Sequence, residues 1–181
     1  MTTTLVILSI MLWVGALVLL PVRQAYAPSL SFLGLALLSF ARTPAGYPVL
    51  PVNNTILIGW LCMTLVVTLA TLLQPAPVVR QTRGMAYIIG GATVGMVVGL
   101  LGYTLSSSVN VLYGVMIVAT VVGIFFGFLL YSRTPDGRPV GISSGHFFHY
   151  LLAKGFPVAI TVMQIGVALV LLIAVNNVNL I

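Results

Sequence analysis

Few side chains in this sequence could carry out chemistry. Asp136 is the only acidic residue among 181, Cys62 is the only cysteine, and His146 and His149 are the two histidines. Hydrolysis by paired carboxylates, carboxylate-rich Mg²⁺ or Ca²⁺ sites and carboxylate proton relays all need more than one acid. A single cysteine cannot form a disulfide within the chain. The sequence therefore predicts neither an enzyme nor a resident metal or other cofactor.

The two histidines are the strongest ligand candidates, because a spacing of three residues places both rings on one side of a helix. Two imidazoles do not complete a zinc site, which usually needs three or four ligands. A haem needs ligands on opposite faces of its ring, which residues three apart cannot supply. The residues around these histidines are mostly aromatic and aliphatic. We therefore predict that His146, His149 and Lys154 belong to an amphipathic interfacial segment at the headgroup boundary.

The composition is that of an integral membrane protein. Hydrophobic residues make up 60% of the chain and charged residues 4%, whereas soluble domains have roughly 25% charged residues. The mean hydropathy is +1.21. These values exclude a water-soluble globular protein, and we expect no nucleic-acid partner.

Six apolar runs predict an all-α, polytopic transmembrane helical bundle. The second run has only 14 residues, which reach roughly 21 Å as a helix, less than the roughly 30 Å of a hydrocarbon core. Pro21 is expected to close the first run, and Pro28 suits the first turn of the second. The runs are Leu5–Leu20, Pro28–Ala41, Thr55–Leu73, Met85–Tyr103, Val111–Tyr131 and Phe156–Val175.

The basic residues predict the orientation of these spans, because cytoplasmic loops carry an excess of Lys and Arg. Five spans allow at best a 5 to 2 division of the seven basic residues. Six spans place Arg42 alone outside and leave inside Arg23, Arg80, Arg83, Arg133, Arg138 and Lys154. We therefore predict that both termini lie outside and that anionic headgroups border the inner side. A bacterial inner (plasma) membrane is the expected location.

Three predicted spans precede the loop around residue 80 and three follow it. The simplest description is one transmembrane domain over residues 1–181. A division into halves 1–76 and 77–181 would orient the halves oppositely, as in inverted-repeat transporters. No sequence similarity between the halves supports that division.

Small residues recur every four positions in the fourth and fifth spans. Such faces let two backbones approach closely, so that dispersion and Cα–H···O contacts hold the helices together. We predict a tight hairpin of these spans, and the alternative is that one face binds a second copy or a partner. The residues of the two faces are Gly91, Gly95, Gly99, Ala119, Gly123 and Gly127.

A few polar residues lie within the spans. Thr64, Thr68 and Thr71 share one side of the third span, and Gln164 lies in the last. Functionally, they could line a path for a small solute. Structurally, a threonine can bond to its own helix and a glutamine can make one interhelical hydrogen bond of about 0.6 kcal/mol. We prefer the structural interpretation.

Together these features predict a non-catalytic integral membrane protein that acts as a structural or accessory subunit of a membrane protein assembly. Its partners would be other membrane subunits or copies of itself. The alternative is a small channel or transporter for a neutral or anionic solute. A third interpretation is a redox subunit in which His146 or His149 assists a partner's haem or quinone.

Overall fold

The computed structural model describes residues 2–43, 46–50, 52–74, 84–102, 109–141 and 145–178. Within this part, the only β-structure is an isolated bridge between Arg42 and Pro48. The remaining elements are helices: α1 (Thr2–Arg23), α2 (Ala27–Phe40), α3 (Asn54–Leu72), α5 (Met85–Leu101), α6 (Val109–Ser132), η2 (Arg138–Val140), α7 (Phe147–Tyr150), η3 (Leu151–Gly155) and α8 (Phe156–Val178).

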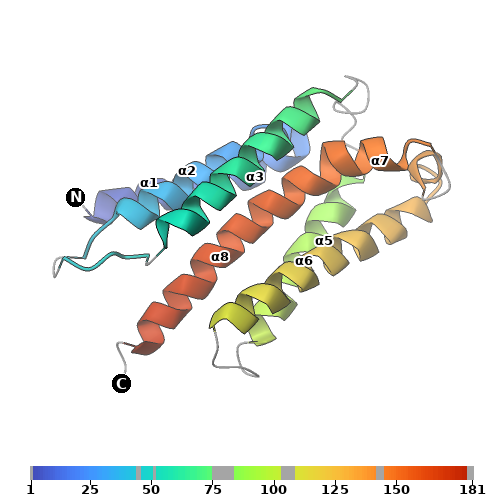
Figure 1. Cartoon of the computed structure of the whole chain (residues 1–181). Helices are drawn as coiled ribbons and strands as arrows, with labels where there is room; N and C mark the ends of the chain where they lie inside the picture. Colours follow the sequence, from blue (N-terminus) through green and yellow to red (C-terminus); the bar gives the residue numbers. More distant parts are fainter. Residues whose placement is uncertain are drawn as a thin grey trace.

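Successive long helices run in alternating directions (Figure 1). One end of the bundle, which we call the α7 end, holds the ends of α1 and α6 and the starts of α2, α5 and α7. The opposite end holds the start of α1 and the end of α8. Arg23, Arg133 and Arg138 follow or end helices at the α7 end, and Arg42 follows α2 at the opposite end.

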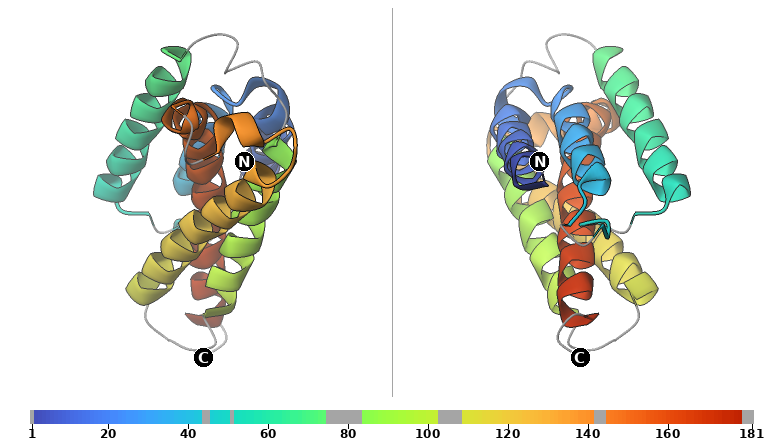
Figure 2. Two further views of the ribbon diagram at one scale, coloured as in Figure 1. Left: turned by 90° about the vertical axis from the view of Figure 1, so that its right-hand side faces the viewer. Right: turned by 90° about the vertical axis from the view of Figure 1, so that its left-hand side faces the viewer.

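The helix around which the others pack is α8. It lies between α1, α2 and α3 on one side and α5 and α6 on the other (Figure 1), and it contacts all five. In the apolar stretch of the Phe147–Leu172 segment 78% of residues are buried, against 17% in α3. Figure 2 shows α3 at the edge of the bundle. The core is therefore centred on α8, and α3 is its most peripheral long helix.

The α1–α2 pair shows how prolines and a glycine shape this side of the bundle. Pro21 lies inside α1 and does not close it, since the helix continues to Arg23. The proline removes one backbone hydrogen bond, and only two residues of the helix follow it. Pro28 lies in the first turn of α2, as the sequence predicts. A Cβ on Gly34 would lie 2.5 Å from Trp13 Nε1, so glycine leaves the room that the indole occupies.

The described residues form an all-helical bundle, as predicted. Four helices are long and apolar enough to cross a membrane: α1, α3, α6 and the Phe147–Leu172 segment. The other two predicted spans correspond to α2 and α5, which have 14 and 17 residues. The last span was predicted to begin at Phe156, whereas the helix begins at Phe147 because α7, η3 and α8 follow one another without a break.

An aromatic cluster joins α7 to the α5–α6 pair. Tyr131 stacks on Tyr150 with ring centroids 6.0 Å apart, and Phe128 meets Phe147 edge to face at 5.2 Å. Gly84 begins α5 beside these rings with φ 83°, and a Cβ there would lie 2.5 Å from the Tyr131 ring. Both the left-handed backbone and the close ring require glycine. Aromatic pairs of this kind contribute roughly 0.5–1.5 kcal/mol each beyond their burial, so the cluster anchors the start of the last helix.

Candidate functional site: a polar seam between α3 and α8

The structure places the two small-residue faces against each other along the α5–α6 contact. A Cβ on Gly91 or Gly95 would collide with the backbone of α6, not with a side chain that could move away. Such close approach lets backbone atoms supply the packing contacts. The facing pairs are Gly91 with Gly123, Gly95 with Ala119, Gly99 with Met116, and Gly127 with the Tyr87 backbone.

The polar residues that the sequence singled out on α3 lie in a different contact. We call this contact the polar seam, and it runs from the α7 end into the middle of the bundle. It consists of three contacts that α3 and the Gln74 after its end make with the continuous α7, η3 and α8 segment: Thr64 with Gln164, Thr71 with the Leu152 carbonyl, and Gln74 with His149.

The innermost contact of the polar seam joins two buried side chains. Gln164 Nε2 donates to Thr64 Oγ1 at 2.7 Å, and Thr64 Oγ1 donates to the Trp60 carbonyl at 2.7 Å. The hydroxyl therefore acts as acceptor and donor at once. Thr68, which is half-buried, faces α2 instead, and its Oγ1 lies 3.4 Å from Ser29 Oγ. The three threonines share a face of α3 but reach two different helices.

The middle contact depends on a π turn at η3. The Phe156 N–H bonds to the Leu151 carbonyl, five residues back, as in a π-helix. Pro157 has no N–H, so the Leu152 carbonyl receives no backbone donor from the next turn. Thr71 Oγ1 lies 3.5 Å from this carbonyl while donating to its own helix. The proline thus leaves a free carbonyl beside α3, and the Thr71 hydroxyl, whose proton is directed to Val67, makes only a long and weak contact with it.

The π turn also contains Lys154, whose side chain has no exposed surface. The sequence predicts this lysine at the headgroup boundary, and the structure shows that its side chain is packed within the bundle. A π turn holds one extra residue, which rotates the preceding side chains by about 100° relative to a regular helix, and η3 packs against both α3 and α5. An ionisable side chain inside an apolar span is costly to bury and marks a functional site by default.

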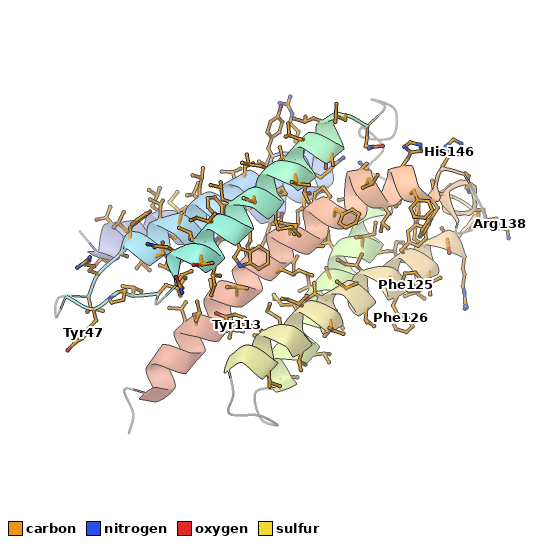
Figure 3. All side chains as sticks on the ribbon, in the orientation of Figure 1. Tyr47, Tyr113, Phe125, Phe126, Arg138 and His146 are labelled. Carbon is orange, nitrogen blue, oxygen red and sulfur yellow. The ribbon has the colours of Figure 1, made fainter. Side chains whose placement is uncertain are left out.

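The two histidines lie at the α7 end and are both exposed. His149 Nδ1 lies 2.8 Å from Gln74 Oε1 and forms the outer contact of the polar seam. His146 precedes α7 at the same end as Arg138, whereas Tyr47 lies at the opposite end (Figure 3). Over the described ranges, no three His, Cys, Asp or Glu side chains are grouped so that they could hold a metal ion.

Sequence reasoning missed the polar contacts that join α1 to α2 and α2 to α8. Trp13 Nε1 donates to the Ser31 carbonyl at 3.2 Å, and Ser31 Oγ donates to the Thr161 carbonyl at 3.2 Å. These contacts link residues far apart in the sequence, and an isolated serine in an apolar run gives no local signal of them. Thr161 Oγ1 and Gln164 Oε1, both buried here, have no hydrogen-bond partner.

No family model, no curated protein and no solved structure matches this chain. The functional interpretation therefore rests on the residues and contacts described above.

Proposed function

We propose that this protein is a non-catalytic subunit of a membrane assembly and binds a transmembrane helix of another subunit through a lateral groove. The observation that carries the proposal is an apolar groove of about 300 Å³ between α3 and α6. Its lining residues are Ile56, Gly59, Trp60, Met63, Ile117, Ile160 and Met163.

The central helix α8 contributes to the lining of the groove, although its residues there are largely buried. Ile160 and Met163 are contributed by α8, between residues of α3 and α6. A Cβ on Gly59 would meet nothing within 4 Å, so a partner backbone can approach closely there. Trp60 supplies a large apolar face, and the unbranched Met63 side chain adapts to a partner's shape. These properties suit a helix packed at van der Waals distance.

A photo-cross-linking amino acid at Met63 tests the proposal in the native membrane. We expect an adduct with one defined membrane polypeptide other than this chain, identified by mass spectrometry, whereas an adduct with a second copy of this chain would contradict a partner subunit. The same amino acid at Val18, exposed on α1, serves as the control and should give no such adduct. Equal adducts from both positions, or lipid adducts alone at Met63, would contradict the proposal.

Gly59→Leu provides the matching functional variant, because Gly59 lines the groove and a Cβ added there meets nothing within 4 Å. We expect recovery of the partner to fall at least about tenfold, the effect of roughly 1.4 kcal/mol. Gly15→Leu is the control, since its Cβ also meets nothing within 4 Å, but on α1. Equal recovery of the partner with both variants would contradict binding at this groove.

We further propose six membrane crossings with both termini outside, in a bacterial inner membrane whose anionic headgroups border the α7 end. The proposal is supported by the alternating helix directions and by the arginines at the α7 end. In a Cys62→Ala background, a cysteine at Tyr47 should react with an impermeant reagent in intact cells. A cysteine at Arg138 should react only after permeabilisation, and the reverse pattern would overturn the orientation.

The polar seam favours a second candidate function, a small channel or transporter for a neutral or anionic solute. Its contacts lead from the exposed His149 to the buried Gln164. A solute could replace these hydrogen bonds only if α3 moved away from α8. Liposome flux that disappears when Thr64, Thr68 and Thr71 are all replaced by valine would support this function. Flux that survives the triple substitution would count against this path.

A further inference from the structure

We propose that Thr161 and Gln164 hold a water molecule at the junction of α2, α3 and α8. The site lies in the interior of the bundle and is separate from the lateral groove, so the proposal stands independently of the proposed function. Both side chains are fully buried. Thr161 Oγ1 and Gln164 Oε1 are the two unpartnered polar atoms of this junction.

The side-chain amide of Gln164 has a hydrogen-bond partner for its donor but none for its acceptor. Its Nε2 donates to Thr64 Oγ1 at 2.7 Å, while its Oε1 is a carbonyl acceptor that needs a donor. Thr64 cannot supply this donor, because its hydroxyl proton is directed to the Trp60 carbonyl. Inside a membrane no bulk water reaches such a group, so an internal partner has to satisfy it.

Thr161 differs from the other buried threonines of the described helices. Thr64, Thr71 and Thr120 each donate to the carbonyl four residues back, at 2.7–2.8 Å. Thr161 makes no such bond, and its hydroxyl has both a donor and an acceptor to offer. A buried hydroxyl that does not bond to its own helix can instead bond to a partner outside that helix.

One small molecule can serve both atoms. Residues three apart on a helix lie side by side, with roughly 5–6 Å between their Cβ atoms. Thr161 adjoins Ser31 of α2 through its carbonyl, and Gln164 adjoins Thr64 of α3. A water can donate to Gln164 Oε1 and accept from the Thr161 hydroxyl, and the Ser31 hydroxyl oxygen offers a further acceptor. Two to four polar partners are what a buried water requires.

Thr161→Val tests the proposal by thermal unfolding of the full chain in lipid nanodiscs. With a shared water, valine removes one partner and strands Gln164 Oε1, so we expect Tm to fall by roughly 3–8 °C. Thr161→Ser keeps the hydroxyl and should restore most of this loss. Thr120→Val is the matched control, because Thr120 is equally buried but bonds only within its own helix, and it should lower Tm much less.

The opposite result overturns the proposal. A dry, unpartnered hydroxyl destabilises the fold, so Thr161→Val would then raise Tm, or change it no more than Thr120→Val does. If Thr161→Val does not fold, an experimental structure of the unmodified protein, at a resolution that shows ordered waters, provides the test. Density about 2.7–3.2 Å from both Thr161 Oγ1 and Gln164 Oε1 is expected, and its absence there would refute the water.

Discussion

The α5–α6 pair and the α3–α8 pair are both helix contacts in an apolar bundle, but they are built differently. Along α5 and α6, Gly91 and Gly95 bring backbone against backbone. Along α3 and α8, the side chains of Thr64 and Gln164 meet through a hydrogen bond. The first contact depends on the absence of side chains, and the second on their polar ends.

The difference indicates which helix can move. A backbone contact loses its dispersion energy steeply with distance and has no alternative partner to replace it. Hydroxyl and amide groups can exchange one partner for another, including water or a solute. Since α3 is also the least buried long helix, its displacement from α8 costs less than separation of α5 from α6.

The largest expected effect is that of Gly95→Leu. Its side chain would collide with the backbone of α6 at Ala119, so the helices must separate. We expect a loss of about 3 kcal/mol or more in the free energy of unfolding, the upper part of the range for overpacking. Unfolding by SDS titration in mixed micelles measures this loss. Gly90→Leu, where a Cβ meets nothing within 4 Å, is the control, and equal losses would remove the distinction between the two contacts.

A smaller effect is expected from Thr64→Val and Gln164→Met. Each variant should lower the free energy of unfolding by about 1 kcal/mol, because each leaves a buried polar group without its partner. A double-mutant cycle should give a coupling of about 0.6 kcal/mol. Thr93→Val is the control, since Thr93 is exposed and bonds to its own helix. A coupling near zero would show that this hydrogen bond does not hold α3 to α8.

Thr68→Val should have the smallest effect, about 0.3 kcal/mol or less. Its hydroxyl lies 3.4 Å from Ser29 Oγ, a separation at which little hydrogen-bond energy remains. The same SDS titration measures it. A loss as large as that of Thr64→Val would show that α2 holds α3 as firmly as α8 does.

The features that could be predicted from the sequence are local and periodic. Twenty apolar residues in a row indicate a helix in a membrane whatever lies beside them. A spacing of four residues in Gly91, Gly95 and Gly99 defines a face before its neighbour is known. The helical class and the small-residue faces therefore needed no knowledge of tertiary contacts.

The buried Lys154 could not be predicted in the same way. Its position depends on a π turn, which the missing N–H of Pro157 favours but does not dictate. Amphipathic periodicity assumes a regular helix. One extra residue in a turn changes the helix face of every residue before that turn, so the spacing no longer predicts which of those side chains are buried. The contact of Ser31 with Thr161 escaped prediction for another reason, because 130 residues separate them in the sequence.

The central position of α8 has a consequence for biosynthesis. Chains are made from the N-terminus, and α8 follows every other long helix described. The α1–α2 and α5–α6 hairpins can pair as soon as their second helices enter the membrane. The hydrogen bonds of Ser31 with Thr161 and of Thr64 with Gln164, however, can form only after α8 has entered the membrane. We therefore expect the core to be completed only when the last helix enters the membrane, because these contacts require residues of that helix.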